Sequence, residues 1–214
     1  MRKEIIIEGE YYHILNRGNN KQAIFNDKRD MARFLFLIIY LQSPKSFYNL
    51  GRQISCFIKN GTFNVSDKEV DEIVENRYVE LVSFSLMPNH FHLIVREVRK
   101  GGISDYMKRV LGGYTMYYNA KYKTSGHHLF QGPFKDIHIK DDPQLLYLSA
   151  YIHNNVRELK NWTKAEYLYP WSSFQDYVNK NRWGELLKID IIKDQFSNSQ
   201  EYKLFVQKSG AKEC

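Results

Sequence analysis

The chain has 214 residues, of which 43% are hydrophobic and 15% aromatic, so it holds enough apolar material for one sizeable core, and global disorder is excluded. Its most continuous apolar stretch, residues 34–41, is far shorter than the roughly 20 residues that cross a bilayer. Basic residues open the sequence, but no sustained apolar region or small-residue cleavage site follows. We therefore expect a cytoplasmic protein without a membrane span or a secretory signal.

Charge points to a polyanionic partner. The 31 Lys and Arg residues against 24 acidic residues give a formal net charge of +7, which favours nucleic acid. Residues 96–123 are both basic and rich in tyrosine, a combination that suits single strands because cations follow phosphates and rings stack on bases. A helix with a basic solvent face and partly buried tyrosines explains the pattern equally well. Only Cys56 and Cys214 occur, so neither a disulfide framework nor a cysteine-based zinc site is expected.

The first part of the chain predicts a strand followed by a helix. Residues 11–16 are aromatic and aliphatic and end at a turn-type cluster, which is typical of a strand. Asp27 is the expected cap of a helix whose apolar residues follow the i, i+3, i+4 spacing until Ser43 and Pro44 stop it. Residues 44–78 have mixed periodicity, with a short charged helix over 66–76, and we interpret them as an insertion.

The remaining predicted elements complete the order strand, helix, strand, strand, helix, strand, with one further helix. Residues 80–86 and 90–95 predict a hairpin around a turn at 87–89. A helix follows from about residue 103, then a strand over 134–140. Asp142, as a capping carboxylate before Pro143, indicates the start of a further helix that runs to about Leu159. This order predicts an α+β fold, a ferredoxin-like βαββαβ antiparallel sheet with an additional C-terminal helix.

Two histidines lie two residues apart in the second strand of the hairpin. Because side chains alternate along a strand, His90 and His92 project from one face, whereas Phe91 and Leu93 point to the other. Neutral imidazole is a common metal ligand, and a strand holds it rigidly. The pair is a candidate metal site, although a polar surface strand explains it as well.

The last predicted helix carries polar groups on the flank of its apolar stripe. Tyr147, Tyr151 and Asn155 follow one another at intervals of four residues and so form one row. The amide oxygen of Asn155 could complete a metal site with the two histidines, and the Tyr151 phenol would then lie beside the metal. Without the histidines, an interfacial tyrosine and a capping amide are the simpler interpretation.

Five segments occur in a specific order and spacing between residues 11 and 178. They are YHILNRGNN (12–20), LMPNHFHLIV (86–95), GHHLFQGPFK (126–135), YIHNN (151–155) and YPWSS (169–173). In these segments the chain resembles the single-tyrosine HUH transposases of the IS200/IS605 type, especially their REP-associated relatives. The resemblance implies an IS200-like transposase domain over residues 1–180, with 44–78 as its insertion and 181–214 as a C-terminal extension.

The resemblance also implies roles for individual residues. His90 and His92 would be metal ligands, Tyr151 the nucleophile carried by the additional C-terminal helix, and an asparagine the third ligand. The usual Asn-Pro-Val-Arg ending of that helix reads NNVR here, so both Asn154 and Asn155 are candidates. The spacing of four residues from Tyr151 favours Asn155.

The activity implied is cleavage and rejoining of single-stranded DNA through a 5′-phosphotyrosine intermediate. One phosphodiester is exchanged for another, so no ATP is required, in agreement with the lack of a phosphate-loop motif in the sequence. The divalent metal, Mg²⁺ or Mn²⁺, would bind the scissile phosphate and disperse its charge.

The expected partner is single-stranded or hairpin DNA, bound by a chain that is either a monomer or a homodimer. Arginine is more usual in the family where Pro133 stands, which leaves Lys135 to take over that contact. The candidate DNA-binding residues are Arg17, Asn19, Asn20, Lys21, Lys108, Arg109, Lys121 and Lys135.

Two other functions use parts of the same pattern. A domesticated, non-catalytic nucleic-acid-binding protein would need only the basic and aromatic surface. A metal-dependent phosphodiesterase that activates water would need the histidines but not Tyr151. Covalent trapping of DNA separates all three functions.

Overall fold

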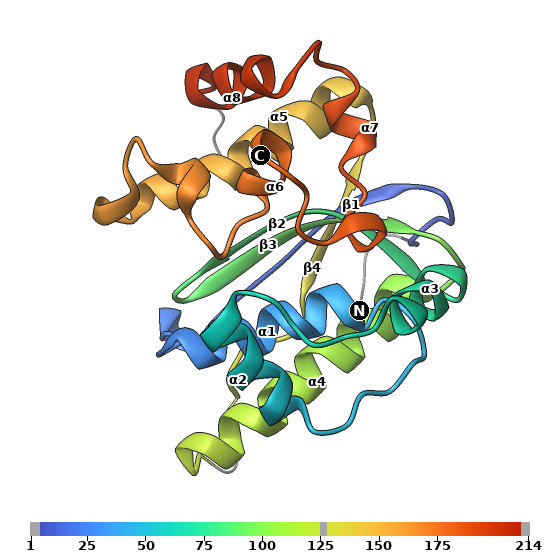
Figure 1. Ribbon diagram of the computed structural model, residues 1–214, viewed down its shortest axis with the longest axis vertical. Coiled ribbons are helices and arrows are strands. Elements are labelled where there is room, and N and C mark those ends of the chain that lie inside the picture. The colour runs from blue at the N-terminus through green and yellow to red at the C-terminus, as the bar shows by residue number, and fades with distance from the viewer. Residues whose placement is uncertain (1–4, 125–127, 211–214) are drawn as a thin grey trace.

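The computed structural model describes residues 5–124 and 128–210, and its centre is a four-stranded antiparallel sheet (Figure 1). The strands are β1 (Tyr11–Arg17), β2 (Val79–Met87), β3 (His90–Glu97) and β4 (Lys135–Ile139). Their order across the sheet is β2-β3-β1-β4, and each neighbouring pair is antiparallel. This is the predicted ferredoxin-like sheet. Gly126 and His127, which belong to one of the five segments, and Cys214 lie outside the described residues.

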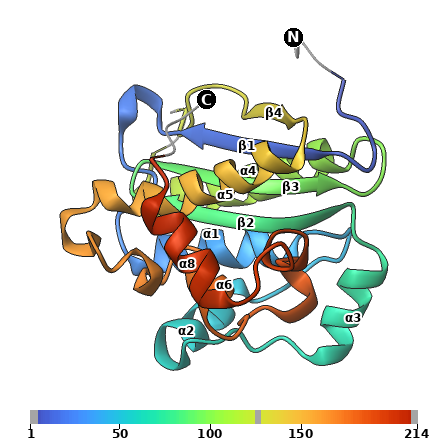
Figure 2. The same ribbon diagram turned by 90° about the horizontal axis from the view of Figure 1, so that it is seen from above.

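Helices cover both faces of the sheet (Figures 1 and 2). On one side lie α1 (Lys28–Tyr40), α2 (Leu50–Asn60), α3 (Asp67–Glu75) and α4 (Gly102–Tyr122). On the other lie α5 (Asp142–Asn154), α6 (Phe174–Val178), α7 (Asp190–Lys193) and α8 (Ser199–Lys208). Short 3₁₀ helices are η1 (Asn19–Lys21), η2 (Asn155–Glu158), η3 (Lys160–Trp162), η4 (Glu166–Leu168) and η5 (Gly184–Leu186). No helix in the described ranges is long and apolar enough to cross a membrane.

The packing of α1 against the sheet shows which side chains of β3 face this helix. Asp27 caps α1 as the sequence predicted, because its carboxylate accepts two backbone hydrogen bonds from the first turn, at 2.8 and 3.0 Å. The buried face of α1 places the Phe34 ring 4.9 Å from the Phe91 ring of β3. Since strand side chains alternate, His90 and His92 point to the opposite face, toward α5.

Residues 44–78 form two helices rather than one. The expected helix over 66–76 is α3, which a capping box between Ser66 and Glu69 begins. The sequence did not predict α2, because only Ile54 and Phe57 of its 11 residues are buried, too narrow a stripe to give a clear helical period. The Phe63 ring that follows α2 stacks on Phe57 at 4.4 Å. Trp183, far along the chain, packs 6.0 Å from Phe63.

In the tyrosine-rich stretch of residues 96–123, several side chains of α4 bind α1 in the interior of the protein. The carboxylate of Asp30 on α1 is fully buried. It accepts hydrogen bonds from Tyr117 at 2.9 Å and Tyr122 at 2.7 Å, and its Oδ1 lies 2.6 Å from the Lys121 ammonium. These groups therefore hold two helices together, which is the structural explanation that the sequence left open.

We expect Asp30→Asn to destabilise the protein strongly. Removing one partner of a buried ion pair leaves the other charged and polar groups uncompensated. The expected loss in unfolding free energy is about 3 kcal/mol. It is no larger because Lys121 keeps some access to solvent. Urea unfolding followed by circular dichroism measures it. Asp105→Asn, which breaks an exposed pair with Arg99, is the control and should cost less than about 1 kcal/mol. Equal effects of the two variants would contradict the structural role of Asp30.

The helix that carries Tyr151 differs at both ends from its prediction. Its cap is Asp141, not Asp142, because the Asp141 carboxylate accepts the amide hydrogen of Gln144 at 2.8 Å and Asp141 has an extended backbone. The α-helix ends at Asn154 and continues as η2 rather than running to Leu159. Consecutive asparagines disfavour an α-helix because their amides bind elsewhere.

Candidate active site

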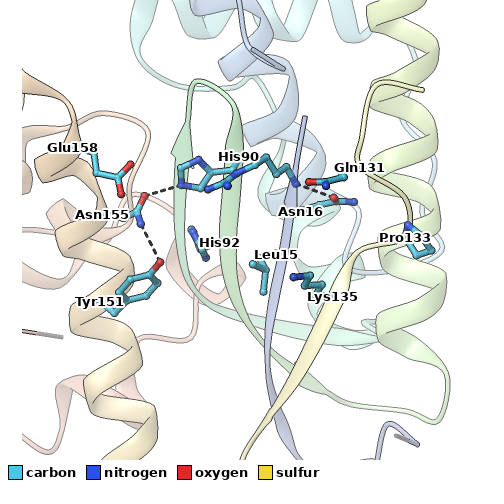
Figure 3. Close-up of a pocket in the computed structure, with 11 residues that line it drawn as sticks. Leu15, Asn16, His90, His92, Gln131, Pro133, Lys135, Tyr151, Asn155 and Glu158 are labelled. Carbon is cyan, nitrogen blue, oxygen red and sulfur yellow. Dashed lines mark hydrogen bonds between the residues drawn. The ribbon is translucent and has the colours of Figure 1, made fainter. Parts of the chain in front are cut away.

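A cavity of about 330 Å³ opens where β1, β3 and the end of α5 meet (Figure 3). Residues from both halves of the chain line it, which is the arrangement that the sequence predicted for the two histidines, Tyr151 and Asn155. The lining residues are Leu15, Asn16, Arg17, His90, His92, Gln131, Pro133, Lys135, Tyr151, Asn155 and Glu158. The sheet contributes the imidazoles, and the end of α5 contributes the phenol and the amide.

His90 lies between two asparagine side chains. Its Nδ1 is 2.7 Å from Oδ1 of Asn89, and its Nε2 is 2.9 Å from Oδ1 of Asn155. A neutral imidazole donates from only one nitrogen. When Nδ1–H donates to Asn89, the Nε2 lone pair faces the lone pairs of the Asn155 amide oxygen. A cation at these two atoms would satisfy both.

His92 is paired with a third histidine that the sequence analysis did not identify. His13 on β1 brings its Nε2 to 2.8 Å from Nδ1 of His92, and both side chains are almost fully buried. Burial lowers the pKa of His13 to about 4. Burial, followed by the neighbouring His13, His90 and Arg17, holds the pKa of His92 well below its usual value. Both rings are thus neutral near pH 7, and Nδ1–H of His92 can donate to His13 while Nε2 keeps its lone pair.

Tyr151 and Asn155 stand one turn apart, as their spacing predicted. Nδ2 of Asn155 donates to the Tyr151 hydroxyl at 3.4 Å (Figure 3). The Tyr151 ring lies edge-on to His92, with centroids 5.4 Å apart at 87°. The phenol is therefore linked through one amide to His90 and held in place by the ring of His92.

The structure distinguishes the two candidate asparagines by position. The Asn154 amide turns away from the cavity and donates to the backbone oxygen of Val206 at 2.7 Å, on α8. Asn155 alone of the two lines the cavity. Although the ending of this helix lacks the proline, its second asparagine, Asn155, therefore still lies beside the histidines.

Glu158 and Gln131 also line the cavity, and the sequence analysis missed both. Glu158 lies three residues after Asn155 in η2, and side chains three apart eclipse in a 3₁₀ helix. A prediction of 3₁₀ geometry after the two asparagines would have found it. Gln131 is held near the cavity because its backbone N–H donates to the backbone oxygen of Arg17 at 2.9 Å.

The predicted DNA-binding residues fall into two groups. Arg17 and Lys135 line the cavity, and Asn19, Asn20 and Lys21 form η1 directly after β1. Lys108, Arg109 and Lys121 lie on α4, on the opposite face of the sheet (Figure 1).

Two of the α4 cations have internal partners. The Arg109 guanidinium donates to backbone oxygens of Ser43 and Lys45 after α1. Lys121 lies 2.6 Å from both Asp27 and Asp30. The side chains that the structure brings to the cavity are therefore Arg17 and Lys135.

A metal at this site would need the Asn155 oxygen. Within the described ranges, no group of three His, Cys, Asp or Glu side chains is arranged to hold a metal ion. Two imidazole nitrogens and one amide oxygen nevertheless form a donor set that suits a divalent cation. In the tautomer whose Nδ1–H donates to Asn89, the lone pairs of His90 Nε2 and Asn155 Oδ1 face each other and fit such an ion.

Comparisons with known proteins found one family model and one solved structure that are similar to the chain. The family model described as "Transposase IS200 like" matches residues 55–155. A solved REP-associated tyrosine transposase, determined bound to a REP hairpin, is similar with a TM-score of 0.54 and 16% identity over 89% of each chain. No curated protein sequence matches the chain.

The His-x-His strand and Tyr151 both lie within the matched segment, and the fold is that of a solved tyrosine transposase. Over residues 55–155 the chain is similar to the IS200-like transposases. The solved relative shares its fold.

Proposed function

We propose that the chain cleaves and rejoins single-stranded DNA through a 5′-phosphotyrosine on Tyr151, with Mg²⁺ or Mn²⁺ held by His90, His92 and Asn155. One observation carries the proposal: the phenol oxygen lies 3.4 Å from an amide whose oxygen is 2.9 Å from a histidine of the His-x-His pair. A nucleophile and three potential metal ligands thus share one cavity.

The bound metal would supply Lewis acidity, which disperses charge on the scissile phosphate. The residues of the chain position the reactants. Nδ2 of Asn155 holds the phenol oxygen, and the edge of His92 fixes the plane of the ring. Arg17 and Lys135 supply positive charge for phosphates next to the one that reacts.

The proposed step keeps the number of phosphodiester bonds constant. The Tyr151 oxygen forms a bond to phosphorus and loses its proton, while the bond from phosphorus to the 3′ oxygen breaks and that oxygen leaves as a hydroxyl. Attack by a 3′-hydroxyl on the phosphotyrosine reverses the exchange and joins the strands. Because a phenol is a weak nucleophile near pH 7, its fixed position beside the cation site is needed for the reaction.

We assign His13 a positioning role in the same site. By accepting the Nδ1 proton of His92, it would select the tautomer whose Nε2 can bind a metal. It lies too deep to meet DNA, since its exposed fraction is 3%.

The two asparagines provide a matched pair of variants. Asn155→Ala should weaken Mn²⁺ binding by at least about tenfold and reduce cleavage, because an oxygen ligand is lost. Asn154→Ala should leave Mn²⁺ affinity near the wild-type value and lower stability instead, because its amide anchors α8. Mn²⁺ titration by electron paramagnetic resonance and thermal unfolding give the two readouts. The reverse pattern would mean that Asn154 is the ligand.

We expect the chain to bind single-stranded or hairpin DNA more tightly than plain duplex, and to lose affinity as salt rises. Phosphate neutralisation releases counterions, so the logarithm of affinity should fall linearly with the logarithm of salt concentration. The solved relative bound to a REP hairpin supports a hairpin as the first substrate to try. Fluorescence anisotropy at matched salt measures the preference, and equal affinity for duplex would count against the transposase mechanism.

Covalent trapping tests the reaction itself. The protein is incubated with Mn²⁺ and single strands from the DNA that flanks its gene, and a denaturing gel detects protein-linked DNA. An adduct supports the tyrosine mechanism. Cleavage without an adduct would indicate a phosphodiesterase that uses water, and binding without cleavage would indicate a non-catalytic binding protein.

A further inference from the structure

A second cavity, of about 450 Å³, lies between the start of α1 and the segment that follows η2. Both segments meet at the same end of the sheet in the two ribbon views (Figures 1 and 2). Its walls are mostly aromatic and aliphatic. The side chains that form the apolar wall are Phe25, Met31, Leu159, Trp162, Tyr169 and Trp171.

The rings of this wall are held in fixed positions. The Tyr169 hydroxyl donates to the backbone oxygen of Leu86 at 2.8 Å. Trp162 packs edge-on against Tyr169, with centroids 5.3 Å apart at 70°, and it remains partly exposed. The Phe25 amide donates to the backbone oxygen of Pro88 at 3.1 Å. Trp162 is thus a partly exposed ring on a rigid apolar wall.

One lysine lines this cavity, and two more lie within two residues of Trp162 in the chain. Lys28 lines the cavity, and Lys160 and Lys164 flank Trp162 in the chain. All three are exposed, and none forms an ion pair with any residue that the structure describes. The one carboxylate in the lining, Asp27, lies 2.6 Å from Lys121 and caps α1.

This cavity adjoins the candidate active site. Glu158 lines the first cavity, and the next residue, Leu159, lines the second. On the sheet side, Pro88 binds the Phe25 amide, and His90 follows it by two residues. A strand whose phosphate lies at His90 would therefore pass from one cavity to the other.

We propose that the cavity around Trp162 is a stacking subsite for a nucleobase of the single strand that the active site cleaves. The proposal rests on the proposed function. Exposed aromatic surface with unpaired lysines suits a base joined to phosphates, because rings stack on any base and cations neutralise its backbone. The basic and aromatic combination that the sequence suggested for residues 96–123 is thus found around residues 159–171, next to the active site.

The test uses the full chain and oligothymidylate that carries a single 2-aminopurine, a base whose fluorescence falls when it stacks. Trp162→Ala should weaken binding about tenfold, the loss of one stacked base, and should abolish the quenching at one position of the probe. Trp162→Phe keeps a ring and should restore both. Tyr48→Ala, which removes an exposed ring that lines neither cavity, is the control and should change neither.

Charge is tested separately. Lys160→Gln should reduce the slope of affinity against salt by about 0.7, the value for one phosphate contact on a single strand. Unchanged affinity and quenching in Trp162→Ala, with wild-type binding of the strand, would overturn the subsite while leaving the proposed function intact. Failure of the wild-type protein to bind the strand would overturn both. A changed oligomeric state in Trp162→Ala without a change in DNA binding would assign the cavity to a second copy of the chain.

Discussion

Tyr151→Phe is expected to abolish the covalent protein–DNA adduct and to leave DNA affinity and stability close to those of the wild type. Phenylalanine keeps the ring and its edge-on packing against His92, so only the proposed nucleophilic oxygen and one long hydrogen bond from Asn155 are lost. Denaturing gels measure the adduct, and thermal unfolding and anisotropy measure the other two properties.

Tyr147 supplies the matched control for this variant. It lies one turn earlier on α5, is 59% exposed and packs against Phe205 of α8 rather than lining the cavity. Tyr147→Phe should therefore retain the adduct. The opposite result, an adduct in Tyr151→Phe and none in Tyr147→Phe, would place the nucleophile one turn earlier. If neither change matters but chelation by EDTA stops cleavage, water is the attacking group.

His90→Ala and His92→Ala should each reduce cleavage to the background and weaken Mn²⁺ binding, because each removes one of the proposed ligands. Their effects on stability should differ. His92→Ala leaves His13 buried without its partner, at a cost of about 1–3 kcal/mol in unfolding free energy. His90→Ala, at the start of β3 and beside the cavity, should cost less.

His138→Ala is the control for the histidine variants. His138 on β4 pairs with Glu10 and lines neither cavity, so its loss should leave cleavage and Mn²⁺ affinity unchanged. Cleavage at the wild-type rate by His90→Ala or His92→Ala with metal limiting would show that the metal lies elsewhere.

The sequence predicted the elements whose evidence is local. The turn cluster after β1, the Asp27 cap and the alternation of residues 90–95 each depend on neighbours a few positions apart. The same holds for the i, i+4 spacing of Tyr151 and Asn155, which placed two side chains in one cavity. For these features, residues close together in the sequence carried the evidence.

Features that depend on distant partners could not be predicted in this way. His13 meets His92 only because β1 pairs with β3, across 79 positions of sequence. Lys121 is occupied by Asp30, 91 positions away, so a candidate DNA contact also serves as a structural ion pair. The cavity around Trp162 lies between the start of α1 and residues 159–171. Because these segments are far apart in the sequence, local periodicity does not predict that they come together.

The anchoring of Asn154 to α8 has a consequence for biosynthesis. Tyr151 and Asn155 flank a residue whose side-chain amide binds the backbone of Val206, 52 positions further along the chain. Chains emerge N-terminus first, so the histidine strand leaves the ribosome before the residues that give the end of α5 this support. A nascent chain that has not yet exposed α8 would hold the imidazoles without this anchor beside the proposed nucleophile, and the proposed cleavage would require α8 to have docked first.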